Sequence, residues 1–405
     1  MAAKNTRLPA HVPESLYRDF DIYAPPGFED DYHAALKRAH ALCPDIFWSP
    51  YQGGHWVAIR GEDIYHMFKD YEYFSNEVGT VPKEERSSLR LLPKESDPPL
   101  HTVYRSLINP WFTPKAVGDL EKQARVITIQ LIESFIGRGE CDFITEFSQH
   151  LPMAIFMRLV DLPYEDREYL MGLVEPLVYR NEHSSRETTE ASITKLRAYL
   201  EKVLKERASN PGNDMLSRMA TASRDGKPLS MEEQLGMAIL VTAGGLDTVA
   251  SMIGFIARFI ADNPSHRRQL AIRPELIPDA VEELIRRHGV ANPSRLIVKD
   301  FVYKGLQFKE GEQITLSAPL HGLDDRVFEN PMAVDFARKV GQHSIFGNGP
   351  HRCPGSFLAR TEIKVFLQEW LQRIPEFSVR PGAKPGIRSG VNGSLYSLPL
   401  VWPVP

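Results

Sequence analysis

A chain of 405 residues, 42% hydrophobic and 25% charged, has enough apolar side chains for a large buried core. Its net charge of −4 gives no reason to expect bulk binding to nucleic acid or to a membrane surface. Three cysteines are too few for a disulfide framework, and residues 1–13 lack the apolar core of a signal peptide. These features predict a globular protein of the cytoplasm.

The first quarter of the chain mixes short helices with a hairpin. Residues 1–30 are rich in proline, and we expect them to be irregular. Periodicity predicts helices over 32–42 and 61–71, and hairpin strands over 47–48 and 55–59. Residues 76–98 are charged, contain prolines and show no period. We expect a long loop there, and long loops in compact proteins are often functional.

Helical patterns dominate from about residue 100 to 290, and prolines interrupt them. Strand-like runs follow, at residues 296–298, 301–303, 313–316 and in short pieces over 377–402. No repeat or low-complexity linker marks a boundary. The fold class predicted is mainly α with small β-sheets.

The most apolar stretch, residues 237–260, is long enough to cross a membrane. Asp247 near its centre and Arg258 near its end favour a helix buried in a soluble core instead. Gly244 and Gly245 each cost about 1 kcal/mol of helix stability relative to alanine. Two unfavourable residues beside the aspartate, in an otherwise good helix, are typical of a functional site. The pair could open a groove for a small molecule, or it could serve close packing between helices.

Two sets of charged residues carry further hypotheses. Glu283 and Arg286 share a helix face, and with Arg338 they could form a buried network, although a surface ion pair is the common alternative. The second set could together bind two carboxylates, although each member taken alone is more often a solvated side chain than a ligand; it contains His101, Arg105, Arg295 and His351.

Cys353 lies in a loop of glycines and prolines, residues 346–355, followed by a helical pattern. A thiol at a helix N-terminus is placed to ionise, and glycines let a flat partner approach the backbone. This arrangement favours a metal ligand beside a haem. Cys43 and Cys141 have no CxxC spacing, so we expect no zinc site.

These markers occur in the order found in the cytochrome P-450 superfamily, which the whole chain resembles. Within it the chain is most similar to the soluble bacterial camphor-hydroxylase group, through residues 244–248, 346–351 and 367–377. The resemblance implies a single, triangular, mainly α domain over 1–405. Haem b would lie between a long distal helix and the helix that follows the cysteine loop, with residues 76–98 as a substrate-access loop.

The resemblance also implies residue roles. Cys353 would be the axial thiolate ligand of the iron, with Phe346 packed near the sulfur. The set that would hold the propionates is His101, Arg105, Arg295 and His351. The structural network would be Glu283, Arg286 and Arg338.

Asp247 and Thr248 would be the catalytic acid–alcohol pair that delivers protons for dioxygen cleavage. The implied reaction inserts one oxygen atom into a substrate C–H bond. Electrons would come from NAD(P)H through a reductase and a [2Fe-2S] ferredoxin, which would dock on the Cys353 face near Arg105. We expect no nucleic-acid or membrane partner.

Leu89 stands where the camphor enzyme has the tyrosine that binds the substrate ketone, so camphor should be a poor substrate. The substrate contacts expected are Leu89, Ala243, Gly244, Ala291 and Val391. Polar contacts could come from Thr242, Tyr179 and Asn392. The resemblance to the camphor-hydroxylase group, together with the loss of the tyrosine, implies an apolar terpenoid-like or norisoprenoid-like cyclic ketone.

Two other functions fit the cysteine loop. One is a thiolate-haem peroxygenase or isomerase that needs no dioxygen, which the Asp247–Thr248 pair disfavours. The other is a haem-binding protein without turnover, for which substrate-dependent oxygen uptake would be absent.

Overall fold

The computed structural model describes residues 7–79, 81–83, 89–178 and 186–404. Tyr179, one of the polar candidates, and parts of the 76–98 loop lie outside the described residues. The helices, in chain order, are α1 (Tyr32–Lys37), α2 (Ala39–Leu42), α3 (Gly61–Lys69), α4 (Leu100–Ile108), α5 (Pro114–Phe135), α6 (His150–Leu159), α7 (Arg167–Val178), α8 (Arg186–Ser209), α9 (Met215–Ala220), α10 (Met231–Leu246), α11 (Thr248–Asp262), α12 (Pro264–Ile272), α13 (Ile277–Arg287), α14 (Ala318–Gly322) and α15 (Ser356–Arg373).

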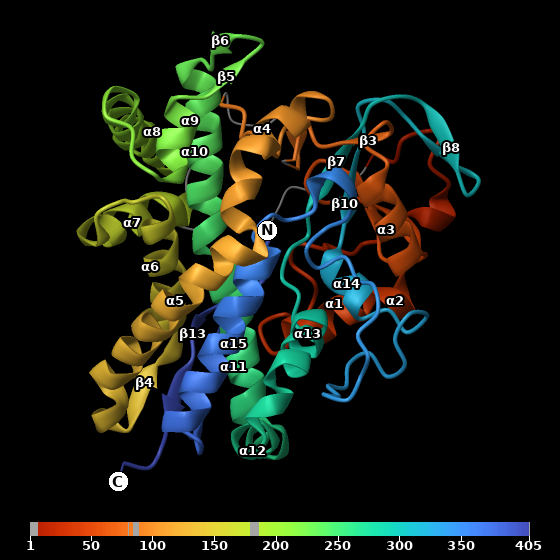
Figure 1. Ribbon diagram of the computed structural model, residues 1–405. Helices are drawn as coiled ribbons and strands as arrows, with labels where there is room; N and C mark the ends of the chain where they lie inside the picture. Colours follow the sequence, from red (N-terminus) through yellow and green to blue (C-terminus); the bar gives the residue numbers. More distant parts are fainter. Residues whose placement is uncertain (1–6, 80, 84–88, 179–185, 405) are drawn as a thin grey trace.

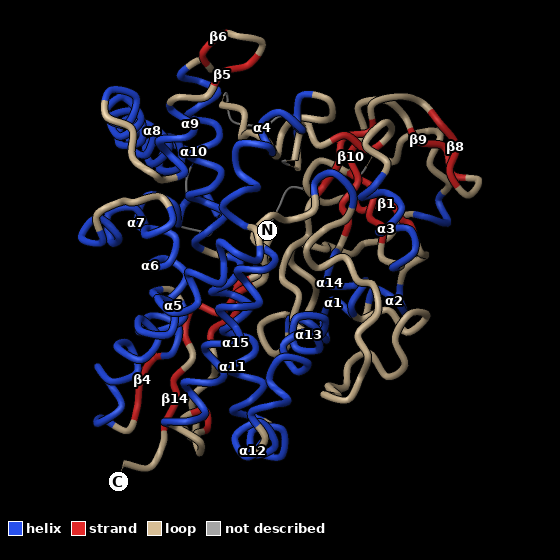
Figure 2. The backbone as a smooth tube through the Cα atoms, viewed as in Figure 1, coloured by secondary structure: helices blue, strands red, loops and turns tan. Residues whose placement is uncertain are grey.

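The strands are short: β1 (Ile46–Ser49), β2 (His55–Ala58), β3 (Phe74–Ser75), β4 (Glu140–Asp142), β5 (Ser223–Arg224), β6 (Lys227–Pro228), β7 (Ser294–Ile297), β8 (Phe301–Tyr303), β9 (Leu306–Phe308), β10 (Gln313–Leu316), β11 (Ser378–Val379), β12 (Gly386–Arg388), β13 (Ser394–Ser397) and β14 (Pro399–Val401). In Figure 1, α5 to α12 and α15 fill one side of the molecule, and the largest sheet lies on the other side with α1 to α3. Figure 2 shows how little of the chain is strand.

The largest sheet joins distant parts of the sequence, in the order β1-β2-β10-β7-β3. The predicted hairpin is its edge, with Trp48 opposite Trp56 in an antiparallel pair. β10 pairs with β2 in parallel and with β7 antiparallel, which places Arg295 opposite Ile314. The sheet therefore holds Arg295 on a buried central strand.

The core between the helices is centred on α15, which packs against α5, α11 and α13. Trp370 of α15 is 1% exposed and contacts the rings of Phe135, Phe143, Phe147 and Phe377. Aromatic rings of this size bury large apolar areas and prefer the tilted and edge-to-face arrangements seen here. This cluster anchors the helix that follows the cysteine loop.

Two predicted helices are each divided in the structure. The 32–42 helix is interrupted at Arg38, between α1 and α2. The 237–260 helix lies within a longer segment, Met231–Asp262, that Asp247 divides into α10 and α11. That segment is apolar enough to cross a membrane by length and composition, but Ile253, Ile256 and other α11 residues are buried in the core. Packing inside the molecule therefore accounts for its apolar character.

Candidate functional site

The break between α10 and α11 places an acid at the centre of the molecule. α10 begins with a capping box, in which Ser230 and Glu233 satisfy each other's backbone N–H groups. It ends at Asp247, whose backbone, at φ −108° and ψ −48°, departs from regular helix geometry. Thr248 opens α11 directly afterwards. The predicted catalytic pair thus lies at the interruption and not inside a continuous helix.

The two glycines before the break have different surroundings. A Cβ on Gly245 would lie 2.8 Å from the ring of Phe156 in α6, so this glycine permits close helix packing. A Cβ on Gly244 would meet nothing within 4 Å, and this residue is exposed although α10 and α11 run through the core. The packing alternative therefore holds at Gly245, whereas Gly244 faces open space.

Two side chains hold the Asp247 carboxyl, one from the first turn of α11 and one from a distant segment of the chain. Asn392 Nδ2 donates to Oδ2 at 2.9 Å, and Ser251 Oγ donates to Oδ1 at 3.3 Å. The carboxyl group is 6% exposed, and burial raises its pKa to about 6, against the opposing effect of these two hydrogen bonds. A carboxyl with this pKa exchanges protons readily near neutral pH.

The role of Asn392 was missed in the sequence. We expected a possible substrate contact, whereas the structure commits its amide to Asp247. Thr242, the other described polar candidate, donates to the Ala238 carbonyl at 2.7 Å within its own helix. An isolated bridge between Ala291 and Asn392 brings two expected pocket residues, Ala291 and Val391, beside this acid.

The cysteine loop is closed by backbone contacts. Cys353 N–H donates to the Phe346 carbonyl at 2.8 Å, and the Arg360 guanidinium lies 4.7 Å from the centre of the Phe346 ring. Gly349 adopts φ +69°, and a Cβ there would lie 2.9 Å from Lys69 Cα, so only glycine fits. The loop therefore fixes the sulfur against the start of α15.

Burial raises the pKa of the Cys353 thiol, while the Gly355 N–H and the charge of Arg105 oppose this effect. The effect of burial on the thiol pKa thus exceeds the opposite effect of the helix N-terminus, which we expected to favour the thiolate. A bound metal cation would stabilise the ionised sulfur. The side chain is nevertheless exposed. Protein surrounds the thiol without covering it, so a ligand can reach the sulfur.

The structure brings the members of the predicted carboxylate-binding set close to one another. The rings of His101 and His351 lie 4.1 Å apart, and the charges of Arg105 and Arg295 both act on His351. Burial lowers the pKa of Arg295 to about 10 and also lowers that of Arg105. Among the described residues, Asp97 is the carboxylate that contacts the set, with Oδ1 3.3 Å from His351 Nε2.

The residues present fit a haem. An exposed sulfur, the open side of Gly244, and two arginines beside two histidines supply a ligand, a space and hydrogen-bond donors for two propionates. Arg295 is 4% exposed, and a guanidinium buried at this depth is costly without an anionic partner. A haem propionate would provide that partner.

The Glu283 network is buried and bidentate. Arg286 donates from Nε and Nη2 to the two carboxylate oxygens of Glu283 at 2.7 and 2.8 Å, and both side chains are 0% exposed. Arg338 Nε donates to the same carboxylate at 3.1 Å. Arg286 also donates to backbone carbonyls of residues 322, 331 and 333. The network therefore ties α13 to the segment that leads into the cysteine loop.

Leu89 is 6% exposed and packs in an apolar cluster with Leu92 and Phe156, against α10. A Cβ on Gly236 of α10 would lie 2.2 Å from the Arg90 carbonyl oxygen, so the loop backbone rests on this helix. Val391 is 52% exposed. The expected substrate contacts thus come from the loop, from α10 and from the segment that carries Asn392.

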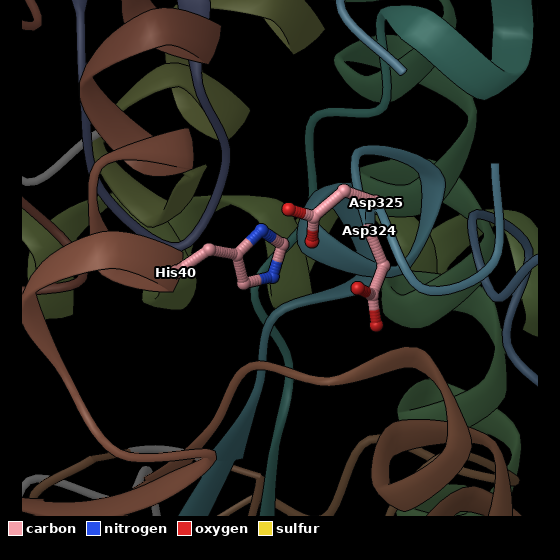
Figure 3. A group of neighbouring side chains, drawn as sticks. All are labelled: His40, Asp324 and Asp325. Carbon is pink, nitrogen blue, oxygen red and sulfur yellow. The ribbon is translucent and has the colours of Figure 1, made fainter. Parts of the chain in front are cut away.

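A second group has side-chain types that metals prefer. Figure 3 shows His40 facing Asp324 and Asp325, with one ligand atom of each within 4.8 Å of the others. Arg60 Nη1 donates to both carboxylates at 2.9 and 2.8 Å, and Lys37 Nζ lies 2.9 Å from His40 Nδ1. Because cations already neutralise these carboxylates, the group is an ion-pair network and we assign no metal to it.

Comparison with known proteins identifies the family. The family model described as Cytochrome P450 matches residues 274–390, which include the Glu283–Arg286 pair and Cys353. "Probable cytochrome P450 127A1" of Sinorhizobium fredii is 32% identical and covers 98% of each chain. The crystal structures of CYP101J2 and CYP101C1 are 38% and 36% identical, each with a TM-score of 0.90, and cover 99% and 98% of this chain and all of theirs.

Other relatives carry the names monooxygenase, hydroxylase and epoxidase. The fold class, the enzyme class and the haem with an axial cysteine thiolate that the sequence predicts are confirmed by these relationships. The chain belongs to the cytochrome P450 family of haem-thiolate monooxygenases and resembles its soluble bacterial members of the CYP101 group.

Proposed function

We propose that this monooxygenase hydroxylates a cyclic, largely apolar terpenoid- or norisoprenoid-like substrate with electrons from a [2Fe-2S] ferredoxin. The observation that carries the proposal is the Asp247 carboxyl, buried and hydrogen-bonded at the break between α10 and α11, beside the open side of Gly244. In this proposal the Asp247 carboxyl transfers protons on the open side of Gly244, close to the apolar residues of α10.

In this proposal Cys353 Sγ is the axial ligand and Phe346 packs beside the sulfur. The haem, when bound, supplies the iron at which dioxygen is activated, and thiolate ligation favours O–O cleavage. The loop contacts of Cys353 orient the sulfur. The groups that hold the propionates by charge-assisted hydrogen bonds are His101, Arg105, Arg295 and His351.

Asp247 takes protons from solvent and passes them toward the cavity through the Thr248 hydroxyl. Its pKa of about 6 leaves both protonation states accessible near neutral pH, which is what a relay requires. Asn392 orients the carboxyl by holding Oδ2. When proton delivery fails, reducing equivalents leave as hydrogen peroxide in place of product.

The proposed substrate follows from the apolar contacts. Leu89 has no hydroxyl to donate a hydrogen bond to the ketone of camphor. The site should therefore bind camphor less selectively than a site with a tyrosine at this position. Ala243, Gly244, Ala291 and Val391 are small or medium-sized, which leaves room for a ring system with a longer side chain. The resemblance of the sequence to the camphor-hydroxylase group supports a substrate of terpenoid type.

We place the ferredoxin on the face outside the cysteine loop. A depression of about 400 Å³ there is lined by Lys69, Arg352 and Arg360, with Glu282 paired to Arg360 at 2.5 Å. This excess of positive charge would steer an acidic partner toward Cys353. We further propose that residues 1–405 act as one domain in the cytoplasm.

The test combines binding with turnover. Titration with cyclic terpenoids and norisoprenoids should move the ferric Soret band from low to high spin, whereas camphor should move it weakly. NAD(P)H-driven oxygen uptake with a reductase and ferredoxin should depend on substrate, and Thr248→Ala should consume electrons with little product. An absence of any spin shift across such compounds would refute the substrate class, and unchanged coupling in Thr248→Ala would refute the relay.

A further inference from the structure

A pocket separate from the haem site lies where the start of α1, the second half of α11 and the end of α13 meet, in the lower half of Figure 1. Its volume is about 240 Å³. Arg258 of α11 lines it, and a helical rise of about 1.5 Å per residue places Arg258 about 15 Å along the helix from Thr248. The pocket is therefore a second site, distinct from the predicted catalytic pair.

Arg287 lines this pocket with most of its guanidinium unpaired. The side chain is 8% exposed, and its Nε donates to the Met332 carbonyl at 2.8 Å. Nη1 is buried and has no hydrogen-bond partner among the described residues, and no described carboxylate oxygen lies within 4.0 Å of the guanidinium nitrogens. Burial lowers the pKa of Arg287 to about 10, so the group is still charged at neutral pH. A buried positive charge without a counter-charge is costly.

His288, the next residue, is also buried and unpaired. It is 4% exposed, and neither ring nitrogen has a hydrogen-bond partner in the part of the chain that the structure describes. Its ring contacts those of His33 and Phe259, with centroids 5.2 and 5.4 Å away. Burial lowers the pKa of His33 to about 3 and holds that of His288 well below its ordinary value, so both rings are neutral. His288 therefore offers an unused N–H donor beside Arg287 and adds no charge.

The remaining pocket residues limit the kind of ligand. The rings of Phe255 and Phe259 line the pocket and give it apolar surface. The second arginine, Arg258, already has a partner, since its Nε lies 3.6 Å from Asp262 Oδ2. Asp262 and Asp31 are exposed at the edge of the pocket, and their charges would repel a ligand with several negative charges. A ligand with one negative charge and an apolar ring fits best.

We propose that this pocket binds a small monocarboxylate with an aromatic or apolar ring, whose carboxylate pairs with Arg287 and whose ring packs against Phe255 and Phe259. Arginine and carboxylate form strong, charge-assisted hydrogen bonds, which would use the nitrogens that are now unpaired. Ordered water could satisfy these N–H groups, but it would not neutralise the buried charge. The inference goes beyond the proposed monooxygenase activity and does not depend on the substrate of the haem site.

The test uses 4-fluorobenzoate and 4-fluorobenzamide, which share a ring and differ in charge. Their dissociation constants are measured by fluorine NMR on the haem-loaded protein in its diamagnetic, reduced and carbon-monoxide-bound form. The acid should bind more tightly than the amide. Arg287→Met should weaken binding of the acid by about 10- to 100-fold and leave the amide nearly unchanged. Arg287→Lys should keep part of the preference, because it keeps the charge but not the fork of donors.

Two further variants control for folding and for net charge. Asp31→Asn keeps a side chain that can cap α1 and removes a negative charge from the edge of the pocket, so the acid should bind about 2- to 5-fold more tightly. A misfolded protein would not gain affinity in this way. Arg268→Met removes one positive charge from a side chain that is 64% exposed and paired with Glu376, outside the pocket. This variant should keep the wild-type ratio of acid to amide affinity.

Three results would overturn the proposal. If the acid binds no better than the amide, or does not bind at all, water occupies the pocket and no carboxylate site exists. If the acid shifts the ferric Soret band and keeps its affinity in Arg287→Met, it binds at the haem site instead. If Arg287→Met does not fold, an acid affinity that is unchanged in both Arg287→Lys and Asp31→Asn contradicts the assignment equally.

Discussion

The hydrogen bond from Asn392 to Asp247 can be removed with one substitution. In Asn392→Ala the charged form of the carboxylate loses the 2.9 Å donor at Oδ2 and keeps only the longer bond from Ser251. Hydrogen bonds to charged groups contribute about 1.5–3 kcal/mol, and one pKa unit corresponds to about 1.4 kcal/mol, so the pKa should rise by about 1 to 2 units. Asp247 would then titrate between about 7 and 8 in place of about 6.

The assay is the pH dependence of product formed per NAD(P)H consumed, measured over about pH 5 to 9. At pH 7 the ionised fraction should fall from about nine tenths to between about one tenth and one half, and the midpoint of the profile should move accordingly. Ser251→Ala should move it less, because its bond is longer. Asn263→Ala removes an amide that donates to the Phe259 carbonyl at 2.8 Å and should not move it. A midpoint that stays in place in Asn392→Ala would show that Asp247 is not the titrating relay.

Three further predictions concern stability, measured by urea unfolding. Glu283→Gln leaves a buried guanidinium without its counter-charge and should cost about 3–5 kcal/mol. Gly245→Ala should cost about 1–3 kcal/mol because of Phe156, whereas Gly244→Ala should not destabilise; equal losses would contradict the assigned surroundings. Burial holds the pKa of the folded His288 far below its ordinary value. Below about pH 6.5 the unfolded chain therefore binds a proton that the folded chain does not, and the free energy of unfolding falls as pH falls. His288→Phe should flatten that acid limb, and an unchanged limb would exclude this source.

The parts of the site that are local in sequence could be predicted. The loop around Cys353 is a contiguous run whose glycines and following helix define its shape, so its place at the start of α15 follows from the chain itself. Asp247 was visible for a similar reason, since an acid beside two glycines contradicts a helix interior. The break at that residue could not be predicted, because it depends on contacts made after folding.

The parts that depend on distant partners could not be predicted. Asn392 meets Asp247 across 145 residues, and no periodicity links the two. The difference between Gly244 and Gly245 is set by Phe156 of another helix.

The central claim is that Cys353 presents a thiolate to the haem iron. The absorption spectrum of the reduced, carbon-monoxide-bound protein tests it most directly, with Cys353→His as the comparison. We expect a strongly red-shifted Soret band in the wild type that is lost in Cys353→His while haem is still bound. A wild-type band at the position of an imidazole-ligated haem, or a red-shifted band that persists in Cys353→His, would contradict it.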